Sequence, residues 1–365
     1  MRPAADLLFL GFLLPLVVVP AVAGTSYDMV KEYHGPTFFD EWTFYDNFDN
    51  LTNGDVIFIP KDKARSSKLA FVDESTNRAI IQVDNSTTVA NGDKRNSVRL
   101  QTDVRYGVGS VWVADFVHVP YGCSVWPAWW AHAPEWPEGG EIDTFEGVNL
   151  APHSQMGLHT LPGCTVTGAQ QTSQFTNSTD CSYTSNDNLG CVVTNPREES
   201  YGEAFAAAGG GVFVTEFATS GISVWFFPRA NVPSAISANS STIDISSLGT
   251  PIGNWPSTTC HSNEFFHPQN LIFTITLCGD FAGADNVFTQ TCNGVCYTDY
   301  VLGDGVNYDT AYFEVNYVRV FSASGTNTIV RDDPTSAAAS RSTPASIFMN
   351  FACAFVTLAF ALLTL

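Results

Sequence analysis

Short runs in which apolar and polar residues alternate make up most of the chain, and Gly, Asn, Asp and Pro separate them. In residues 318–321, for example, two valines alternate with Arg and Phe. Runs of this kind, rich in Val, Ile, Phe, Tyr and Thr, predict β-strands, whose side chains point to alternate faces with a period of two. The clearest predicted strands lie within residues 78–84, 97–103, 109–120, 211–219, 221–229, 270–280 and 311–321.

Neither an internal repeat nor a long helical pattern interrupts these runs between residues 24 and 325. Many short strands with turn signals between them predict an all-β fold, a sandwich or jelly roll. A length of about 300 residues is acceptable for one such domain. We therefore predict one β domain over residues 24–325 and a Ser/Thr/Ala/Pro linker over 326–346.

Both ends of the chain depart from this pattern. Residues 1–23 combine Arg2, an apolar run and the small residues Ala-Val-Ala, which is the layout of a secretory signal peptide. A membrane anchor is the alternative, for which the run is short. Residues 347–365 form an uncharged apolar tail after a small, polar segment, as in a glycosylphosphatidylinositol (GPI) anchor signal. The alternative is a transmembrane helix, but no Lys or Arg follows the tail to hold it on a cytosolic side.

The number of cysteines is consistent with an exported protein. Of the nine, Cys353 lies in the apolar tail, and the other eight allow up to four disulfides. Proximity favours pairing Cys292 with Cys296, or Cys181 with Cys191. A zinc site at 292–296 is the alternative, but no second cluster of ligands accompanies it.

The net charge and the N-glycosylation sequons indicate which partners and which location the protein has. The formal net charge of −20 excludes a nucleic-acid binder, which needs Lys and Arg against phosphates. We expect an extracellular monomer at the cell surface or in the cell wall, attached to the membrane only through a lipid. Sequons that predict N-glycosylation occur at Asn50, Asn85, Asn177 and Asn239.

Three acids lie close together in "EGGEIDTFEGVN", residues 138–149: Glu141, Asp143 and Glu146. In a regular strand Glu146 would point away from the other two. A β-bulge at Thr144 or Phe145 would return it to their face. Two such carboxyl groups suit glycoside hydrolysis, in which one attacks or activates water and the other protonates the leaving oxygen. An acid between them can separate their pKa values.

A solvated acidic patch is the alternative reading of these acids. Against it, Ile142, Thr144 and Phe145 are interleaved as in a strand that packs on its other face. The preceding segment also contains four tryptophans, and indole rings beside carboxylates suit the apolar C–H faces of sugars. We expect at least one of the four to lie in the core. They are Trp126, Trp129, Trp130 and Trp136.

The stretch "GGEIDTFEGVN" resembles the active-site signature of glycoside hydrolase family 16 in its bulged form, Glu-x-Asp-x-x-Glu. This form is typical of laminarinase-like endo-β-1,3(4)-glucanases. The similarity to the secreted fungal members covers residues 35–322, including "YGCSVWPAWW" at 121–130 and "TLCGDFAG" at 276–283. It implies a β-jelly-roll sandwich with a concave substrate cleft and a retaining endo-glycosidase acting on β-1,3 or mixed β-1,3/1,4 glucan.

Roles follow from the resemblance position by position. It makes Glu141 the nucleophile, Glu146 the general acid/base and Asp143 their auxiliary. One departure is Phe281, where the family pattern has Trp, because a phenyl ring lacks the indole N–H donor.

The resemblance also places four residues against the substrate. Trp130 and Trp136 fall where the family lines its sugar subsites, and His159 falls near the acid/base. Arg99 is the fourth; a structural role is the alternative for both Arg99 and His159.

The resemblance implies no cofactor. A structural calcium ion occurs in family members, but no ligand loop in this sequence places one. Two other functions stay open: a cell-wall glucan transglycosylase of the same fold, and an inactive glucan-binding wall protein.

Overall fold

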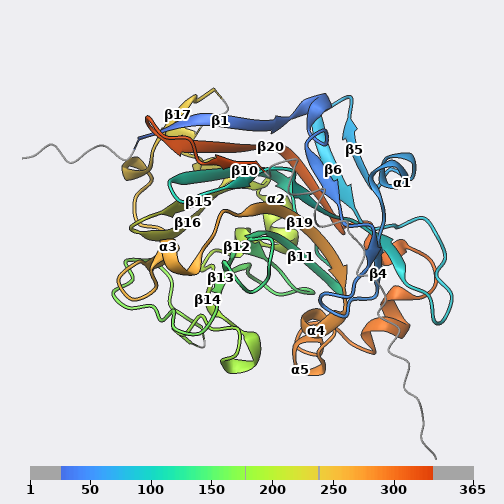
Figure 1. The fold of residues 1–365 in the computed structure, drawn as a ribbon. Helices are drawn as coiled ribbons and strands as arrows, with labels where there is room; N and C mark the ends of the chain where they lie inside the picture. The colour runs from blue at the N-terminus through green and yellow to red at the C-terminus, as the bar shows by residue number, and fades with distance from the viewer. Residues whose placement is uncertain (1–25, 177, 237–238, 332–365) are drawn as a thin grey trace, which may run out of the picture. The chain divides into compact units, whose positions relative to one another are not determined.

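Two antiparallel β-sheets form the body of the structure (Figure 1). The computed structural model describes residues 26–176, 178–236 and 239–331. By internal contacts the chain divides into residues 1–330 and 331–365, and the two sheets belong to the first unit. The predicted signal peptide and apolar tail lie outside the described residues. Within the described ranges, no helix is long and apolar enough to cross a membrane.

The first sheet has nine strands and the second has seven. The first runs in the order β17 (Thr242–Asp244), β1 (Ser26–His34), β20 (Tyr312–Ala323), β10 (Ser110–His118), β15 (Gly211–Ala218), β16 (Gly221–Pro228) and β18 (Gly253–Pro256), with β6 (Arg78–Gln82) beside β20 and β5 (Ala70–Asp73) beside β6. The second runs in the order β14 (Cys191–Thr194), β13 (Gln155–His159), β12 (Glu141–Glu146), β11 (Val125–His132), β19 (Asn270–Leu277), β8 (Arg99–Thr102) and β2 (Trp42–Phe44).

Smaller elements fill the connections between these strands. Two further sheets are formed by β3 (Asn47–Phe48), β4 (Val56–Phe58) and β7 (Arg95–Ser97), and by β9 (Arg105–Tyr106) and β21 (Ile329–Val330). The helices are short: α1 (Lys61–Ser66), α2 (Gly202–Ala207), α3 (Ser262–Phe265), α4 (Gly279–Ala282) and α5 (Asp285–Phe288). Single helical turns are η1 (Gly35–Thr37), η2 (Asn186–Asn188), η3 (Glu198–Ser200), η4 (Arg229–Asn231), η5 (Ser234–Ile236), η6 (Ile245–Leu248), η7 (Tyr297–Val301) and η8 (Val306–Tyr308).

The two large sheets face each other across the main hydrophobic core. The ring of Phe116 in β10 lies 5.9 Å from that of Phe273 in β19 and 6.3 Å from that of Trp129 in β11. Phe145 of β12 enters the same cluster, 6.5 Å from Phe116. Burial of facing aromatic side chains is the dominant stabilising term in such a sandwich. The predicted all-β jelly-roll sandwich is confirmed.

The nine-stranded sheet is also covered on its other side. Val318 and Val320 of β20 lie in the main core, whereas Phe321 packs in a second cluster with Ile236 and Ile243. The alternation read in residues 318–321 is therefore confirmed. The second cluster covers the outer face of the central strands of this sheet, whereas β11 and β12 of the seven-stranded sheet keep partly exposed residues on the face that carries the acids.

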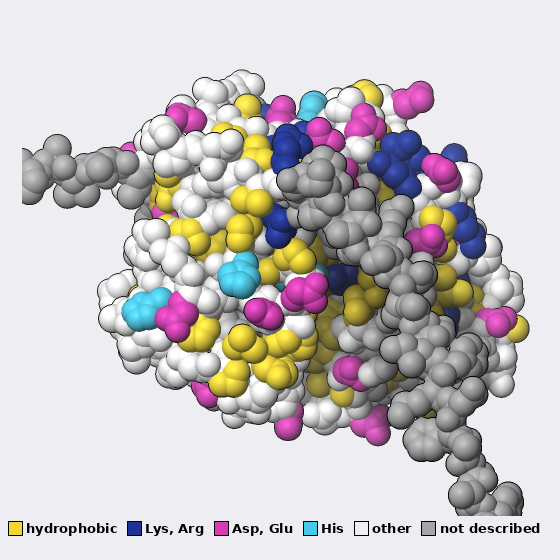
Figure 2. Space-filling model, in the orientation of Figure 1, with side chains coloured by type: hydrophobic (Ala, Val, Ile, Leu, Met, Phe, Trp, Pro, Cys, Tyr) yellow, Lys and Arg dark blue, Asp and Glu magenta, His cyan; other side chains and the backbone are white. Residues whose placement is uncertain are grey.

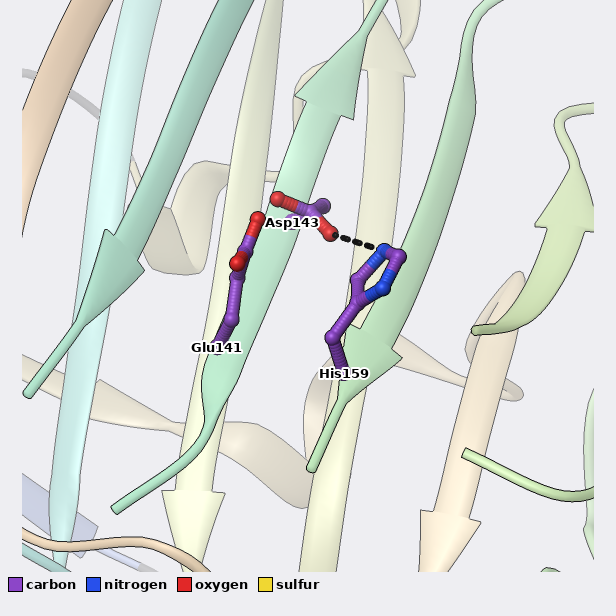
Figure 3. Close-up of side chains that lie close together, drawn as sticks. All are labelled: Glu141, Asp143 and His159. Carbon is purple, nitrogen blue, oxygen red and sulfur yellow. Dashed lines mark ion pairs between the residues drawn. The ribbon is translucent and has the colours of Figure 1, made fainter. Parts of the chain in front are cut away.

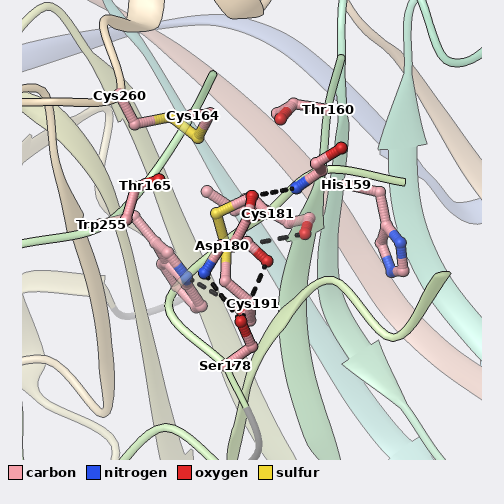
Figure 4. The surroundings of a disulfide bond; sticks show 12 residues. His159, Thr160, Cys164, Thr165, Ser178, Asp180, Cys181, Cys191, Trp255 and Cys260 are labelled. Carbon is pink, nitrogen blue, oxygen red and sulfur yellow. Dashed lines mark hydrogen bonds between the residues drawn. A yellow bond between two sulfur atoms is a disulfide. The ribbon is translucent and has the colours of Figure 1, made fainter. Parts of the chain in front are cut away.

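Four disulfides link the eight cysteines of the described residues. They join Cys123 to Cys292, Cys164 to Cys260, Cys181 to Cys191, and Cys278 to Cys296. Figure 4 shows the Cys181–Cys191 bond, beside which the indole N–H of Trp255 donates to the carbonyl of Cys191 at 3.0 Å.

The predicted Cys181–Cys191 pair is confirmed, and the Cys292–Cys296 pair is wrong. The reason lies in β11 and β19, which are antiparallel neighbours with Val125 opposite Leu277. Cys123, just before β11, and Cys278, just after β19, therefore lie at neighbouring strand ends. Each forms a disulfide with one cysteine of the 292–296 loop. The zinc reading of that loop is also wrong, because both of its sulfurs are in disulfides.

Residues 326–330, which the sequence assigns to the linker, pack against the β domain. Ile329 of β21 pairs with Tyr106 of β9, and Thr328 is buried with its hydroxyl 2.7 Å from that of Ser322.

Peptide mapping without reduction tests the disulfide pattern. Digestion of the oxidised protein should yield the linked peptides Cys123–Cys292 and Cys278–Cys296, because each bond closes a geometry already set by β11 and β19. A peptide linked through Cys292 and Cys296 would contradict the structure.

Candidate active site

Strand β12 carries a β-bulge at the acidic signature. Two consecutive tryptophans of β11 pair with Phe145 and Asp143, which leaves Thr144 as the extra residue. The pairing with β13 shifts at the same place. Because of this extra residue, Glu146 returns to the face of Glu141 and Asp143, and the predicted bulge is confirmed.

The inner side of the sandwich holds the bulge in place. The hydroxyl of Thr144 lies 2.5 Å from that of Thr215 in the opposite sheet, and Phe145 is fully buried in the core. The two residues between Asp143 and Glu146 thus both point inward, and the acids point outward.

The three acids line one hollow on the seven-stranded sheet, and Figure 3 shows Glu141 and Asp143 side by side on β12 with His159 on β13. On the face drawn in Figure 2, acidic and histidine side chains lie next to a group of hydrophobic side chains. The other residues that line the hollow are Asp49, Leu51, Thr52, Phe58, Arg99, Trp126, Ala128, Trp130, Thr274 and Thr276.

Glu141 receives hydrogen bonds from two directions. The indole N–H of Trp136 donates to its Oε2, and its carboxyl also shares a hydrogen bond with Asp143. Trp136 keeps 43% of its surface exposed and packs edge-on against Tyr183. The acid predicted to be the nucleophile is therefore fixed in direction by both neighbours.

Asp143 is the most deeply enclosed of the three acids, with 5% of its surface exposed. Burial, followed by the charges of Glu141 and Glu146, raises the pKa of Asp143 well above its usual value. The raised pKa favours the protonated form of the Asp143 carboxyl group, in which it can donate the hydrogen bond that it shares with Glu141. His159 stands opposite Glu141 in the sheet, and its Nε2 lies 3.5 Å from Asp143 Oδ2.

Glu146 is held by two donors, one on each carboxyl oxygen. The indole N–H of Trp126 donates to Oε1 at 2.7 Å, and the side-chain amide of Gln155 donates to Oε2 at 2.6 Å. Burial raises the pKa of Glu146, while these two bonds and the charge of His159 act in the opposite direction. A carboxyl group with a raised pKa is suited to donate a proton near neutral pH.

The four tryptophans divide as expected between core and hollow. Trp129 is 1% exposed and belongs to the core. Trp126 and Trp130 line the hollow, and Trp136 binds Glu141 from its edge. The contact of Trp126 with Glu146 was not predicted, because neither indole direction nor cross-strand distance can be read from spacing.

Arg99 lies in the wall of the hollow and is part of a stacked group. Its guanidinium lies 4.7 Å from the Trp130 ring, and its Nη2 is 3.1 Å from His132 Nε2. Burial lowers the pKa of Arg99 to about 10, and the charge of Glu141 acts against this shift. Arg99 therefore stays cationic at neutral pH and offsets the negative charge of Glu141. The sequence did not single out His132, which pairs directly with Glu141 across β11 and β12.

Asp49 is a fourth acid in the hollow that the sequence analysis missed. Burial alone would raise the pKa of Asp49, but hydrogen bonds, led by those from Thr276 and Thr52, lower it overall. Its Oδ2 accepts from both hydroxyls at 2.6 Å. Asp49 thus stays anionic and fastens the Leu51–Thr52 loop to β19.

Phe281, the departure from the family pattern, packs edge-on against Trp126 with ring centroids 5.4 Å apart. It therefore supports the indole that contacts Glu146 instead of lining the hollow itself.

One group in the described part of the chain brings three potential metal ligands together: Glu141, Asp143 and His159. Calcium takes six to eight oxygen ligands, and this group offers an imidazole and two carboxyls that share a hydrogen bond. The arrangement fits proton sharing and does not fit a calcium site.

Comparison with known proteins gives one consistent family. The family model for an XgeA-like catalytic domain of glycoside hydrolase family 16 matches residues 42–321. A probable glycosidase of Schizosaccharomyces pombe is 36% identical over 305 residues, covering 83% of this chain and 71% of the relative. The endo-1,3(4)-beta-glucanase xgeA of Emericella nidulans is 32% identical over 324 residues, covering 85% of this chain and 50% of the relative. The chain thus spans about half the length of the Emericella protein.

Two solved structures resemble this one closely. Laminarinase 16A of Phanerochaete chrysosporium, with 6-O-glucosyl-laminaritriose in its donor and acceptor sites, has a TM-score of 0.77 at 34% identity, covering 81% of this chain and 100% of the other. An elongating family 16 β-1,3-glucosyltransferase has a TM-score of 0.74 at 34% identity, with the same coverage.

Replacement of one indole tests the electrostatics of Glu146. In Trp126→Phe the donor to Oε1 is lost, so the charged carboxylate is less stabilised and the pKa of Glu146 should rise further. Titration of ¹³C-labelled glutamate carboxyls by NMR measures it. Trp130→Phe is the matched control, because that indole donates to the hydroxyl of Thr274. An unchanged or lower Glu146 pKa in Trp126→Phe would contradict this account.

Proposed function

This chain belongs to glycoside hydrolase family 16, and we propose that it is a retaining endo-glycosidase that hydrolyses β-1,3 or mixed β-1,3/1,4 glucan by double displacement. The observation that carries the proposal is the bulge at Thr144, which aligns Glu141, Asp143 and Glu146 in one hollow. A pair of carboxyl groups in different electrostatic surroundings is what acid-assisted nucleophilic displacement requires.

In the first step Glu141 attacks the anomeric carbon while Glu146 protonates the leaving oxygen. The C–O bond to the leaving sugar breaks as an ester bond to Glu141 forms. Glu146 enters this step protonated, in keeping with the direction of its pKa shift. Asp143 donates its hydrogen bond to Glu141 and so holds the attacking carboxylate in one orientation.

In the second step Glu146, now a carboxylate, takes a proton from water as the water attacks the anomeric carbon. The ester bond breaks, the sugar leaves with its original anomeric configuration, and both glutamates return to their starting states. Trp126 and Gln155 hold both oxygens of Glu146, so the same carboxyl can act as acid and then as base without turning.

We assign substrate binding to Trp130, Trp136, His159 and Arg99. Support for the two tryptophans is that Trp130 lines the hollow and Trp136 is partly exposed beside Glu141. Relatives named endo-1,3(4)-beta-glucanases support a β-glucan as the substrate.

Transglycosylation is the second candidate function. It is favoured by the likeness to an elongating β-1,3-glucosyltransferase. The same covalent intermediate serves both reactions, and the outcome depends on whether water or a sugar hydroxyl resolves it.

We further propose that the protein is exported, glycosylated and held at the cell surface by a lipid. Four disulfides support an oxidising compartment. The sequons at Asn50, Asn85 and Asn239 are exposed, as glycosylation requires.

Substitution of the proposed nucleophile separates the two chemical steps. Glu141→Ser should reduce laminarin and lichenan hydrolysis to background, because no ester bond can form. The variant should still condense α-glycosyl fluorides, since the fluoride replaces the missing intermediate. Reducing-sugar release and mass spectrometry of the products measure the two activities.

Glu146→Ala is the matched control for that experiment. Loss of the general acid should lower kcat on unactivated glucan by roughly 10²–10⁴-fold, and azide should restore turnover of substrates with good leaving groups. Near-normal hydrolysis by Glu141→Ser, or an inverted first product, would refute the assignment.

Attachment to the cell can be tested directly. If a lipid holds the protein, phospholipase or hydrogen fluoride should release from expressing cells a chain that lacks the residues after about 340. A released or detergent-extracted chain that still contains Phe348–Leu365 would show that the tail spans the membrane.

A further inference from the structure

A second hollow lies beside the acids and has no part in the proposed double displacement. Its lining comes from three segments, residues 138–139, 161–163 and 259–267. The first of these segments leads into β12 just before Glu141, and the second follows β13 just after His159. Since Glu141 and His159 are cross-strand partners, this hollow opens at the end of the strand pair that carries the proposed nucleophile.

The walls of this hollow are fixed to one another. Cys164, directly after the second segment, forms a disulfide with Cys260 of the third. Gly139 of the first segment has a φ of +81°, and a side chain there would meet the His267 ring at 2.7 Å. The close packing of glycine and imidazole, with the disulfide, keeps the three segments in a constant arrangement.

Polar groups without partners face this hollow. In the described parts of the chain, no hydrogen bond or ion pair engages the side chains of Glu138, Glu264 or His267. His261 binds the Ser257 carbonyl through Nδ1 at 2.7 Å, which leaves its Nε2 available. Phe265, partly buried, adds an aromatic ring. Carboxylates, imidazoles and a ring together suit sugar hydroxyls and a sugar C–H face.

A cation is a poorer fit than a sugar. Among the described residues, the one group with three converging metal ligands is Glu141, Asp143 and His159, so no three potential ligands meet in the second hollow. Two acids and two histidines that line one hollow can bind several hydroxyls of an extended ligand.

We propose that the second hollow is a remote subsite, which binds glucosyl units of the same β-glucan that is cleaved between Glu141 and Glu146. This inference rests on the proposed function. Glu138 lies three residues before Glu141, which is at most roughly 10 Å of extended backbone. Trp136, exposed and bonded to Glu141, precedes it in the same segment. A glucan chain that continues past Glu141 along this segment enters the second hollow.

The consequence is a preference for long chains. Oligosaccharides too short to reach the subsite are cleaved with the binding energy of the main hollow alone. Longer ones gain extra binding, which raises kcat/KM with chain length.

Two variants and a control measure this gain. For Glu264→Ala and Phe265→Ala, kcat/KM is determined on β-1,3-gluco-oligosaccharides from trisaccharide to octasaccharide, with thermal unfolding as a check on folding. Each variant should lose about fivefold on the longest substrates, as expected for one lost hydrogen bond or packing contact, and nothing on the shortest substrate cleaved. Glu74→Ala, at an exposed loop between β5 and β6, is the matched control and should match the unsubstituted protein at every length.

A loss that is equal at all chain lengths, or absent at all of them, would overturn the remote subsite while leaving the proposed function standing. If the unsubstituted protein cleaves no β-glucan at all, the proposed function fails, and the subsite fails with it.

Discussion

Side chains alternate between the two faces of a regular strand, which limits the spacings at which carboxylates can share a face. In β12 a one-residue bulge interrupts this alternation. If these six residues formed a regular strand without the bulge at Thr144, Glu146 would point into the core that Phe145 now occupies. The extra residue is tolerated because both inward side chains find partners, a hydroxyl in the opposite sheet and the aromatic cluster around Phe116. The site therefore depends on the packing of the sandwich behind it.

The three acids of β12 would repel one another and lose hydration if all were charged. The structure avoids this by giving each a different partner. Burial and the neighbouring acids raise the pKa of Asp143, which favours a proton shared with Glu141, and Glu146 is bound by an indole and an amide. Arg99, cationic and stacked on Trp130, offsets part of the remaining negative charge. The differences among the acids thus come from their neighbours and not from their own chemistry.

Local patterns in the sequence were sufficient for much of this arrangement. Alternation gave the strands and the sandwich, and the spacing of the three acids required the bulge. Contacts between distant segments were not readable: Gln155 and Trp126 meet Glu146 only through the order of β11, β12 and β13. The same limit explains the error at Cys292 and Cys296, since closeness along the chain said nothing about which strand ends lie side by side.

The disulfides Cys123–Cys292 and Cys278–Cys296 also affect local unfolding of the domain. Cys123 and Cys278 flank the adjoining ends of β11 and β19, and both are tied to one short loop. Fraying of either strand would have to carry the loop and its neighbour along. We therefore expect local opening at these strand ends to be suppressed, so that backbone amides there exchange with solvent only when a larger cooperative unit unfolds. β11 and β19 also line the hollow that holds the acids. Reduction of these two disulfides would therefore allow this part of the site to unfold locally, without unfolding of the whole domain.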